Sequence, residues 1–182
     1  MYEGYRAIAG AYDRLNADVD YEKWSGFMQA CFDRYLPARP QIVLDLACGT
    51  GRMTFPLCDR GYDLIGIDGS ADMLSEAYRK STDRTIRVLD ERGVDDLPPD
   101  VTTPLFLQQD MRAFELYGTV RLAVCTVDAF NYLLTVKDVE RFLWGIHNYL
   151  EPGSLFLFDV NTPYKFSTVY GSRRLTVQKL TD

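Results

Sequence analysis

The stretch Gln41 to Asp68, QIVLDLACGTGRMTFPLCDRGYDLIGID, decides the fold, because it contains a strand, a glycine turn, a helix and a second strand in that order. Ile42 to Leu46 is apolar except for Asp45, as expected of a parallel strand that is buried on both faces. Gly49 and Gly51 follow directly. Because they lack a Cβ atom, they allow positive φ and let a ligand lie against the backbone. The stretch therefore predicts one ligand-binding βαβ unit.

A second acidic residue ends the second strand of this unit. Leu64 to Ile67 is an apolar run, and Asp68 follows it about 20 residues after the glycine turn, the spacing of an acid that binds ribose hydroxyls. A dinucleotide-binding GxGxxG pattern would place its third glycine where Thr54 stands. The spacing therefore predicts that Asp68 binds a ribose, and Thr54 counts against NAD.

LDLACGTG followed by GIDGSADML resembles the nucleotide-binding core of the class I S-adenosylmethionine-dependent methyltransferases. The resemblance covers about residues 1–166. It rests on the acid before the glycine turn, the acid that ends the next strand and the Ser-x-x-Met start of the next helix. It implies an α/β, Rossmann-like fold with a mainly parallel sheet in the order 3-2-1-4-5 and helices on both faces. It also implies S-adenosyl-L-methionine as the cofactor; a similar core without a cofactor is the alternative.

The resemblance also implies which residues surround the cofactor. The two glycines of the turn would admit its amino-acid end, and Asp68 would bind its ribose hydroxyls. Met73, at the Ser-x-x-Met position, would pack on the adenine, with an ordinary core methionine as the alternative. Asp110 would accept from the adenine amino group and the backbone N–H of Met111 would bind a ring nitrogen. A helix N-cap is the alternative for Asp110, since aspartate favours that position.

Aromatic residues recur at helical spacing near the N-terminus. Tyr5 and Tyr12 share one face of a helix predicted within residues 2–15, and Tyr21 and Trp24 begin the apolar face of the next helix. The stretch YRAIAGAYDRLNADVDYEKW resembles an N-terminal lid in one bacterial branch of these methyltransferases. Aromatic faces attract a desolvated cation such as a sulfonium. These four side chains are therefore candidate cofactor-binding residues, and plain packing in the core is the alternative.

The end of the fourth predicted strand, Leu122 to Val127, is where the reacting methyl group should face a substrate. Asp128 follows it and is the candidate catalytic residue, placed to orient or deprotonate a nucleophile with Asn131 or Tyr132 in support. Some amine methyltransferases carry Asn or Asp, two prolines and an aromatic residue here. This chain does not match that pattern, so the acceptor atom stays open. His147, the only histidine, falls late in the next predicted helix, at the wrong end of the sheet for a general base.

We expect a single domain over residues 1–182, with a helical lid (1–36), a cofactor-binding core (41–160) and a tail (161–182). The polar, proline-containing stretch 81–103 is predicted as a surface insertion. The resembling family adds a helix and two strands after the fifth strand, so the chain is either a fragment or a shortened fold. A truncated sheet exposes an edge strand that can pair with another chain, so a homodimer is possible.

Composition narrows the class of partner. A net charge of −6 repels a phosphate backbone, so no nucleic acid is expected. No apolar run approaches the about 20 residues of a membrane span, and the N-terminus lacks the features of a signal peptide, which predicts a cytoplasmic protein without membrane contact. The four cysteines form no CxxC pair and are expected to be reduced, buried thiols without a metal.

The predicted function is transfer of the sulfonium methyl group to a small-molecule acceptor by direct displacement. Such a reaction needs mainly alignment and exclusion of water. Two alternatives stay open: a non-catalytic module that binds S-adenosylmethionine or S-adenosylhomocysteine and acts through dimerisation, and an NAD-dependent oxidoreductase. A cavity beside Asp128 that is large enough for a substrate would favour the enzyme over the binding module, whereas Thr54 and Asp110 argue against NAD.

Overall fold

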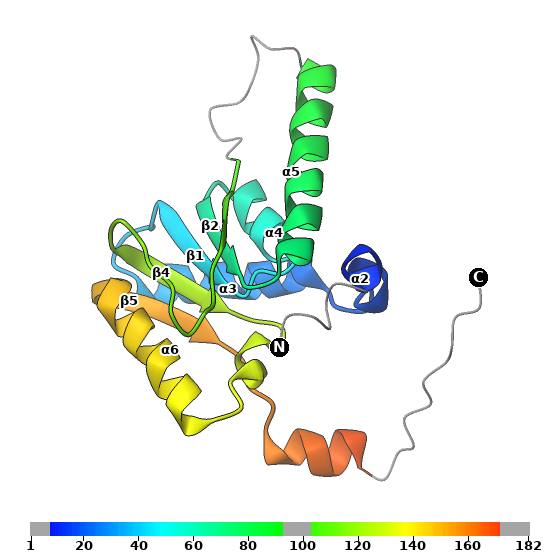
Figure 1. Cartoon of the computed structure of the whole chain (residues 1–182). Helices are drawn as coiled ribbons and strands as arrows, with labels where there is room; N and C mark the ends of the chain where they lie inside the picture. The colour runs from blue at the N-terminus through cyan, green and yellow to red at the C-terminus, as the bar shows by residue number, and fades with distance from the viewer. Residues whose placement is uncertain (1–7, 93–102, 172–182) are drawn as a thin grey trace.

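The computed structural model describes residues 8–92 and 103–171, which build a five-stranded sheet in the order β3-β2-β1-β4-β5 (Figure 1). Each pair of neighbouring strands is parallel. The predicted class I order is therefore confirmed. The strands are β1 Ile42–Leu46, β2 Asp63–Asp68, β3 Leu105–Gln108, β4 Val120–Cys125 and β5 Leu150–Phe158.

Helices cover both faces of the sheet, as expected for a parallel sheet that is buried on each side. The helices of the described residues are α2 Ala9–Leu15, α3 Tyr21–Tyr35, α4 Thr54–Asp59, α5 Ala71–Arg92 and α6 Val136–Tyr149, with a 3₁₀ turn, η2 Ala129–Tyr132, and a π-helical turn, η3 Lys165–Tyr170. Helices α3 and α4 pack on one face, and α6 packs on the other. In Figure 1, α5 rises past the end of the sheet and η3 lies apart from it.

The central strand β1 shows why the sheet needs two layers of helix. Val43 packs with α3 and α4, whereas Leu44 and Leu46 pack with α6 on the opposite face. All three side chains are buried, since successive residues of a strand point to opposite faces. The apolar run in the sequence is therefore divided between two hydrophobic cores, and β1 lies between them.

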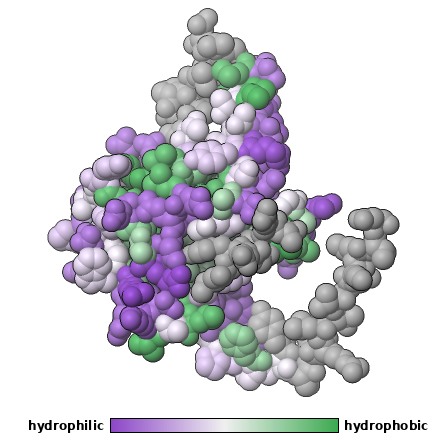
Figure 2. Space-filling model, viewed as in Figure 1, coloured by the Kyte–Doolittle hydropathy of each residue, from purple (hydrophilic) through white to green (hydrophobic). Residues whose placement is uncertain are grey.

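Two boundary predictions differ from the structure. The expected surface insertion is helical as far as Arg92, because α5 continues through polar residues that pair along the helix, such as Arg79 with Asp83. The outer side of α5 is correspondingly hydrophilic (Figure 2). The apolar run Leu155 to Asp159 predicts the fifth strand, but β5 begins earlier, at Leu150, because it continues past a register shift in its pairing with β4. Residues 93–102 of the predicted insertion lie outside the described residues.

Several other expectations can be compared with the described residues. The N-terminal helix is confirmed over Ala9–Leu15, and its earlier part lies outside those residues. The sequence allows at most one strand in the tail, over residues 168–181; its first residues belong to η3 instead, and residues 172–181 lie outside the described residues. None of the four cysteines, all of which lie in the described residues, forms a disulfide, and all except Cys31 are buried. His147 lies exposed in the last turn of α6, just before β5 begins. None of the helices described has the length and apolar character needed to cross a membrane.

Gly66 of β2 provides a test of packing in this fold. A Cβ atom added there would lie 2.7 Å from the Phe106 ring and 2.9 Å from the sulfur of Cys48. Gly66→Ala should therefore lower the free energy of unfolding by about 1–3 kcal/mol, measured by urea denaturation. Gly118→Ala is the matched control, because its Cβ would meet nothing within 4 Å. Equal stability of the two variants would contradict this account of the packing.

Candidate functional site

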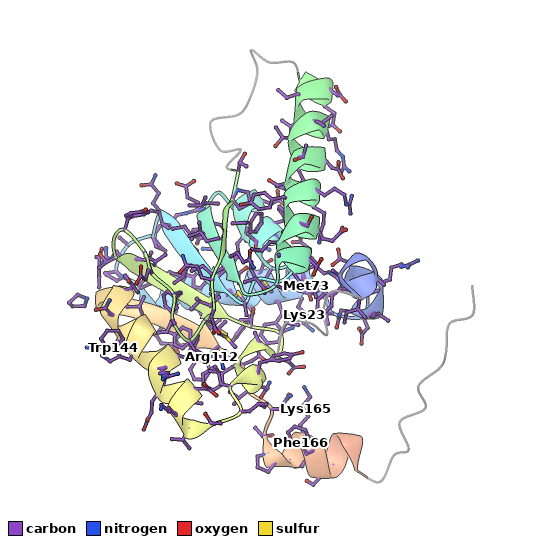
Figure 3. All side chains as sticks on the ribbon, in the orientation of Figure 1. Lys23, Met73, Arg112, Trp144, Lys165 and Phe166 are labelled. Carbon is purple, nitrogen blue, oxygen red and sulfur yellow. The ribbon has the colours of Figure 1, made fainter. Side chains whose placement is uncertain are left out.

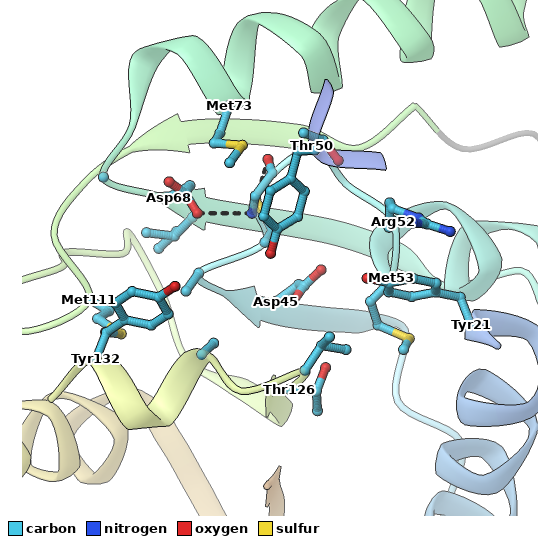
Figure 4. A pocket seen from close by; sticks show the side chains of 18 of the residues that line it. Tyr21, Asp45, Thr50, Arg52, Met53, Asp68, Met73, Met111, Thr126 and Tyr132 are labelled. Carbon is cyan, nitrogen blue, oxygen red and sulfur yellow. Dashed lines mark hydrogen bonds between the residues drawn. The ribbon is translucent and has the colours of Figure 1, made fainter. Parts of the chain in front are cut away.

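A cavity lies over the carboxyl ends of β1, β2 and β4, where ligands bind in open α/β sheets (Figure 4). Its empty space is about 950 Å³, counting the part that is open to solvent. The side chains and backbone that form it come from six elements (α2, α3, β1, β2, α5 and η2) and the loops between them. Its lining includes Tyr12, Tyr21, Asp45, Gly49, Thr50, Arg52, Asp68, Met73, Met111, Arg112, Thr126, Val127, Ala129 and Tyr132.

The carboxylate of Asp68 joins two segments at the floor of the cavity. The backbone N–H of Gly49 donates to one carboxylate oxygen at 2.9 Å, and the N–H of Ser70 donates to the other at 2.8 Å. Each oxygen keeps a further lone pair for a ligand. Gly49 has φ +56°, and an added Cβ would meet nothing within 4 Å, so the backbone is open to the cavity at this point. Asp68 therefore holds the glycine loop and the start of α5 in place.

A second carboxylate, Asp45, lies beneath the loop. Thr54 Oγ1 donates to it at 2.6 Å, so the threonine at the third position of the glycine pattern has a structural partner. Asp45 is fully buried, and this burial raises the pKa of its carboxyl group to about 7. Near neutral pH the group therefore changes between its neutral and charged forms, in contrast to an ordinary aspartate.

Tyrosine rings and methionine side chains form the walls of the cavity. Tyr12 comes from α2, Tyr21 from α3 and Tyr132 from η2, while Met73 and Met111 line the end near α5 and β3. Burial raises the pKa of Tyr21 to about 12 and also raises the pKa of Tyr12. Both phenols therefore stay protonated at neutral pH, and their rings remain neutral.

Helix α2 is attached to the glycine loop and to α5 through Asp13. Thr50 Oγ1 donates to one oxygen of Asp13 at 2.6 Å, and Lys80 Nζ contacts the other at 2.6 Å. Arg52 Nη1 donates to the backbone oxygens of Asp13 and Asn16 at 2.8 and 2.7 Å. These contacts place the N-terminal helix across one side of the cavity.

The turn after β4 carries an unusual backbone. Val127 and Asp128 have φ values of +59° and +67°, in the left-handed region that costs most for a β-branched residue. The N–H of Asp128 donates to Asp159 at 3.0 Å, and one oxygen of its carboxylate lies 3.3 Å from Lys165 Nζ of η3. Figure 3 shows Lys165 on the η3 side of the site. Val127 and Ala129 line the cavity, whereas Asp128 between them does not.

A family model described as a methyltransferase domain matches residues 43–153, more than half of the chain. This chain belongs to that family. YqeM of Bacillus subtilis, named as a methyltransferase, is 34% identical over 168 residues that cover 91% of this chain and 59% of that protein. The resemblance of the glycine loop and the following strand to the class I S-adenosylmethionine-dependent methyltransferases is therefore confirmed.

Solved structures agree with this membership. A crystal structure of an S-adenosylmethionine-dependent methyltransferase from Clostridium acetobutylicum has a TM-score of 0.70 and 32% identity, covering 92% of this chain and 61% of its own. The glycopeptide N-methyltransferase MtfA in complex with S-adenosylmethionine has a TM-score of 0.57 and 25% identity; the match covers 74% of this chain and 53% of MtfA. The methyltransferase domain described here thus spans less than two thirds of the length of each of these relatives.

The structure brings most of the predicted cofactor residues of this methyltransferase domain to one cavity. Those that line it are Tyr12, Tyr21, Gly49, Asp68, Met73 and Met111. Those in the described residues that do not are Trp24, Gly51 and Asp110, and Tyr5 lies outside the described residues. Asp128, the predicted catalytic residue, does not line the cavity either. Sequence reasoning overlooked Arg52 and Thr126, although Arg52 directly follows the glycine turn and Thr126 lies at the end of the fourth predicted strand, both of which were expected to face the ligand.

The predicted residues outside the lining have other contacts. Trp24 belongs to α3 and packs, partly buried, against the hydrophobic core between α3 and the sheet. Its ring meets that of Phe27 edge-on. Gly51 has φ +78°, and a Cβ there would lie 2.8 Å from the Phe55 ring, so this glycine allows the loop to turn close to α4. Asp110 binds the side chain and backbone N–H of Arg112. It lies in a turn rather than at the start of a helix, so the N-cap alternative is wrong.

The buried carboxyl of Asp45 predicts a pH dependence of stability. Its folded pKa of about 7 exceeds the about 3.9 of an unfolded aspartate, so the folded state binds more protons between these values and loses stability as pH rises. Asp45→Asn cannot titrate. The stability of the wild type relative to this variant, measured by urea denaturation, should fall by about 2 kcal/mol between pH 5 and pH 7.5. A constant difference across this range would contradict the raised pKa.

Proposed function

We propose that this methyltransferase domain binds S-adenosyl-L-methionine in the cavity and transfers its methyl group to a small-molecule acceptor. The observation that carries the proposal is the order of chemistry along the cavity. Met73 and Met111 line one end, Asp68 offers carboxylate lone pairs next to it, and Tyr21 with Arg52 forms the far end, while Tyr132 lies beside Met111 (Figure 4). An adenine, a ribose and a charged methionine end occur in the same order in this cofactor.

The donors and acceptors of the cavity fit each part of the cofactor. Buried methionine side chains suit a flat aromatic base, and the remaining lone pairs of Asp68 suit two vicinal hydroxyls. The open backbone at Gly49 leaves room for an extended chain. The neutral rings of Tyr12 and Tyr21 suit a positively charged sulfur, since an aromatic face attracts a desolvated cation by about 2 kcal/mol.

When bound, the cofactor supplies an electrophilic methyl group on a positively charged sulfur. The contribution of this chain is to align that methyl group with an acceptor and to exclude water from it. Tyr12, Tyr21 and Tyr132 come from three different elements and line the cavity. Residues 1–36 are proposed as the lid, supported by the position of α2 and the first residue of α3 at the cavity.

The acceptor site is proposed beside the turn after β4. Asp128 remains the proposed catalytic residue, although its carboxylate is held by Lys165 and by Asn131 Nδ2 at 3.4 Å rather than lining the cavity. To act on a nucleophile, it would exchange these partners for the acceptor. Thr126 and Tyr132 line the cavity on either side of this turn and offer hydroxyl groups that could orient a small polar acceptor.

The class of acceptor is proposed from charge and from relatives. The net charge of −6 opposes binding to a nucleic-acid backbone. The glycopeptide acted on by MtfA supports a small, non-nucleic-acid acceptor, without naming the one used here. Among the described residues and the comparisons, no observation favours the non-catalytic binding module. A homodimer and a cytoplasmic location stay predictions.

The proposed cofactor is tested by calorimetric titration of the 182-residue chain. S-adenosylmethionine and S-adenosylhomocysteine should bind with micromolar dissociation constants, about −8 kcal/mol, because the cavity offers partners for every part of them. NAD should bind far more weakly, since Thr54 occupies the position of the third glycine. Binding of NAD as tight as that of S-adenosylhomocysteine would remove the proposal.

Replacement of Asp68 tests the ribose site. Asp68→Ala should weaken S-adenosylhomocysteine at least about tenfold, because hydrogen bonds to a charged acceptor contribute about 1.5–3 kcal/mol each. The same change should lower the free energy of unfolding, since the backbone N–H groups of Gly49 and Ser70 lose their acceptor. Asp63→Ala, at the opposite end of β2, is the matched control and should retain affinity. Unchanged affinity in the folded Asp68→Ala variant would exclude the ribose role.

A further inference from the structure

Arg52 is a cation in the cavity, and its contacts with the described residues use only part of its guanidinium group. It follows the glycine turn directly, lines the cavity and is half-buried. Its guanidinium lies over the ring of Tyr21, with 4.3 Å from its carbon to the ring centroid. Within the described residues, its printed hydrogen bonds all use Nη1. The edge formed by Nε and Nη2, which matches a carboxylate in a bidentate geometry, therefore remains for a ligand.

The charges along the cavity point to the Arg52 end for an anionic group. Asp45 and Asp68 line the middle, where they would repel a carboxylate. Arg112, the other arginine in the lining, pairs with the carboxylates of Asp110 and Asp138. Among the described residues, Arg52 forms no ion pair within 4 Å. Figure 4 shows it on the opposite side of the cavity from Met111, with the two acids between them.

The same guanidinium also holds helix α2. Its Nη1 donates to the backbone oxygens of Asp13 and Asn16, at the C-terminal end of a helix of only seven residues. Such carbonyl groups have no partner within the helix and carry the negative end of its dipole. A helix this short is not stable alone in water. The placement of α2, and with it Tyr12, therefore depends on anchors such as Arg52.

We propose that Arg52 binds the carboxylate of the cofactor's methionine end, and that this contact makes closure of α2 over the cavity depend on that end of the ligand. This inference rests on the proposed function and names the residue that recognises one part of the cofactor. A carboxylate held by the Nε and Nη2 edge fixes the guanidinium, which then presents Nη1 to the carbonyl groups of α2. The adenosine part makes no contact of this kind.

Two ligands that differ only at this end test the proposal. S-adenosylhomocysteine carries the amino-acid group, whereas 5′-methylthioadenosine has the same adenosine and thioether without it. Arg52→Met should weaken S-adenosylhomocysteine at least about tenfold in calorimetric titration and change 5′-methylthioadenosine by less than about twofold. Arg52→Lys should fall between the wild type and the methionine variant, because an ammonium keeps the charge but loses the fork.

Arg84→Met is the matched control for loss of an arginine. Arg84 also lies over an aromatic ring, 5.2 Å from the centroid of Phe55, and it pairs with Asp59 outside the cavity. This variant should bind both ligands as the wild type does. Retained binding of 5′-methylthioadenosine by Arg52→Met shows that the variant is folded, so a loss restricted to S-adenosylhomocysteine cannot arise from unfolding.

Limited proteolysis in the turn at residues 16–20 reports the coupling to α2. In the wild type, S-adenosylhomocysteine should slow cleavage at this turn, whereas saturating 5′-methylthioadenosine should leave the rate unchanged. In the Arg52→Met variant, neither ligand should slow cleavage. Equal weakening of both ligands, unchanged affinity for S-adenosylhomocysteine, or equal protection by both would overturn the inference. If the wild type does not bind S-adenosylhomocysteine, both the proposed function and this inference are contradicted. If the wild type binds it but one of the outcomes above is found, only the role of Arg52 is contradicted.

Discussion

The arrangement of the site depends on the carboxylate of Asp68 at the end of β2. It accepts one backbone N–H from the glycine loop after β1 and another from the start of α5, so it fixes two segments that belong to different βα connections. Burial raises the pKa of this carboxyl group, while the hydrogen bonds from Ser70 and Gly49 oppose the shift. A single side chain therefore sets the shape of the cavity floor and presents lone pairs to a ligand.

The sheet and its central motif were predictable because their signals are local. Apolar runs of strand length, the glycine turn and Asp68 lie within 28 consecutive residues, Gln41 to Asp68, and the parallel order follows from the family resemblance. The same reasoning placed Met73 and Met111 at the cavity. The length of α5 was missed, because a polar helix stabilised by pairs such as Arg79 with Asp83 resembles a surface loop in composition.

Features that depend on which side chains meet in the folded chain, or on the backbone conformation of a turn, could not be predicted. The hydroxyl of Thr54 donates to Asp45 beneath the loop. This contact gives a reason for a threonine at the third position of the glycine pattern, and it is visible only in the folded structure. Asp110 was expected at the cavity, yet its carboxylate is engaged by Arg112 two residues later. For Asp128, the left-handed backbone of the turn directs the chain so that its neighbours, rather than its own side chain, line the cavity.

The attachment of α2 has a consequence for the order in which the protein assembles. This helix is synthesised before the sheet, but its anchors Thr50 and Lys80 lie 37 and 67 residues after Asp13. A seven-residue helix does not persist alone, so it docks only after β1, the glycine loop and α5 have formed. The cavity is therefore built open and covered last. In the folded protein, α2 packs mainly against α5 rather than against the strands, so its opening leaves the pairing of the sheet intact.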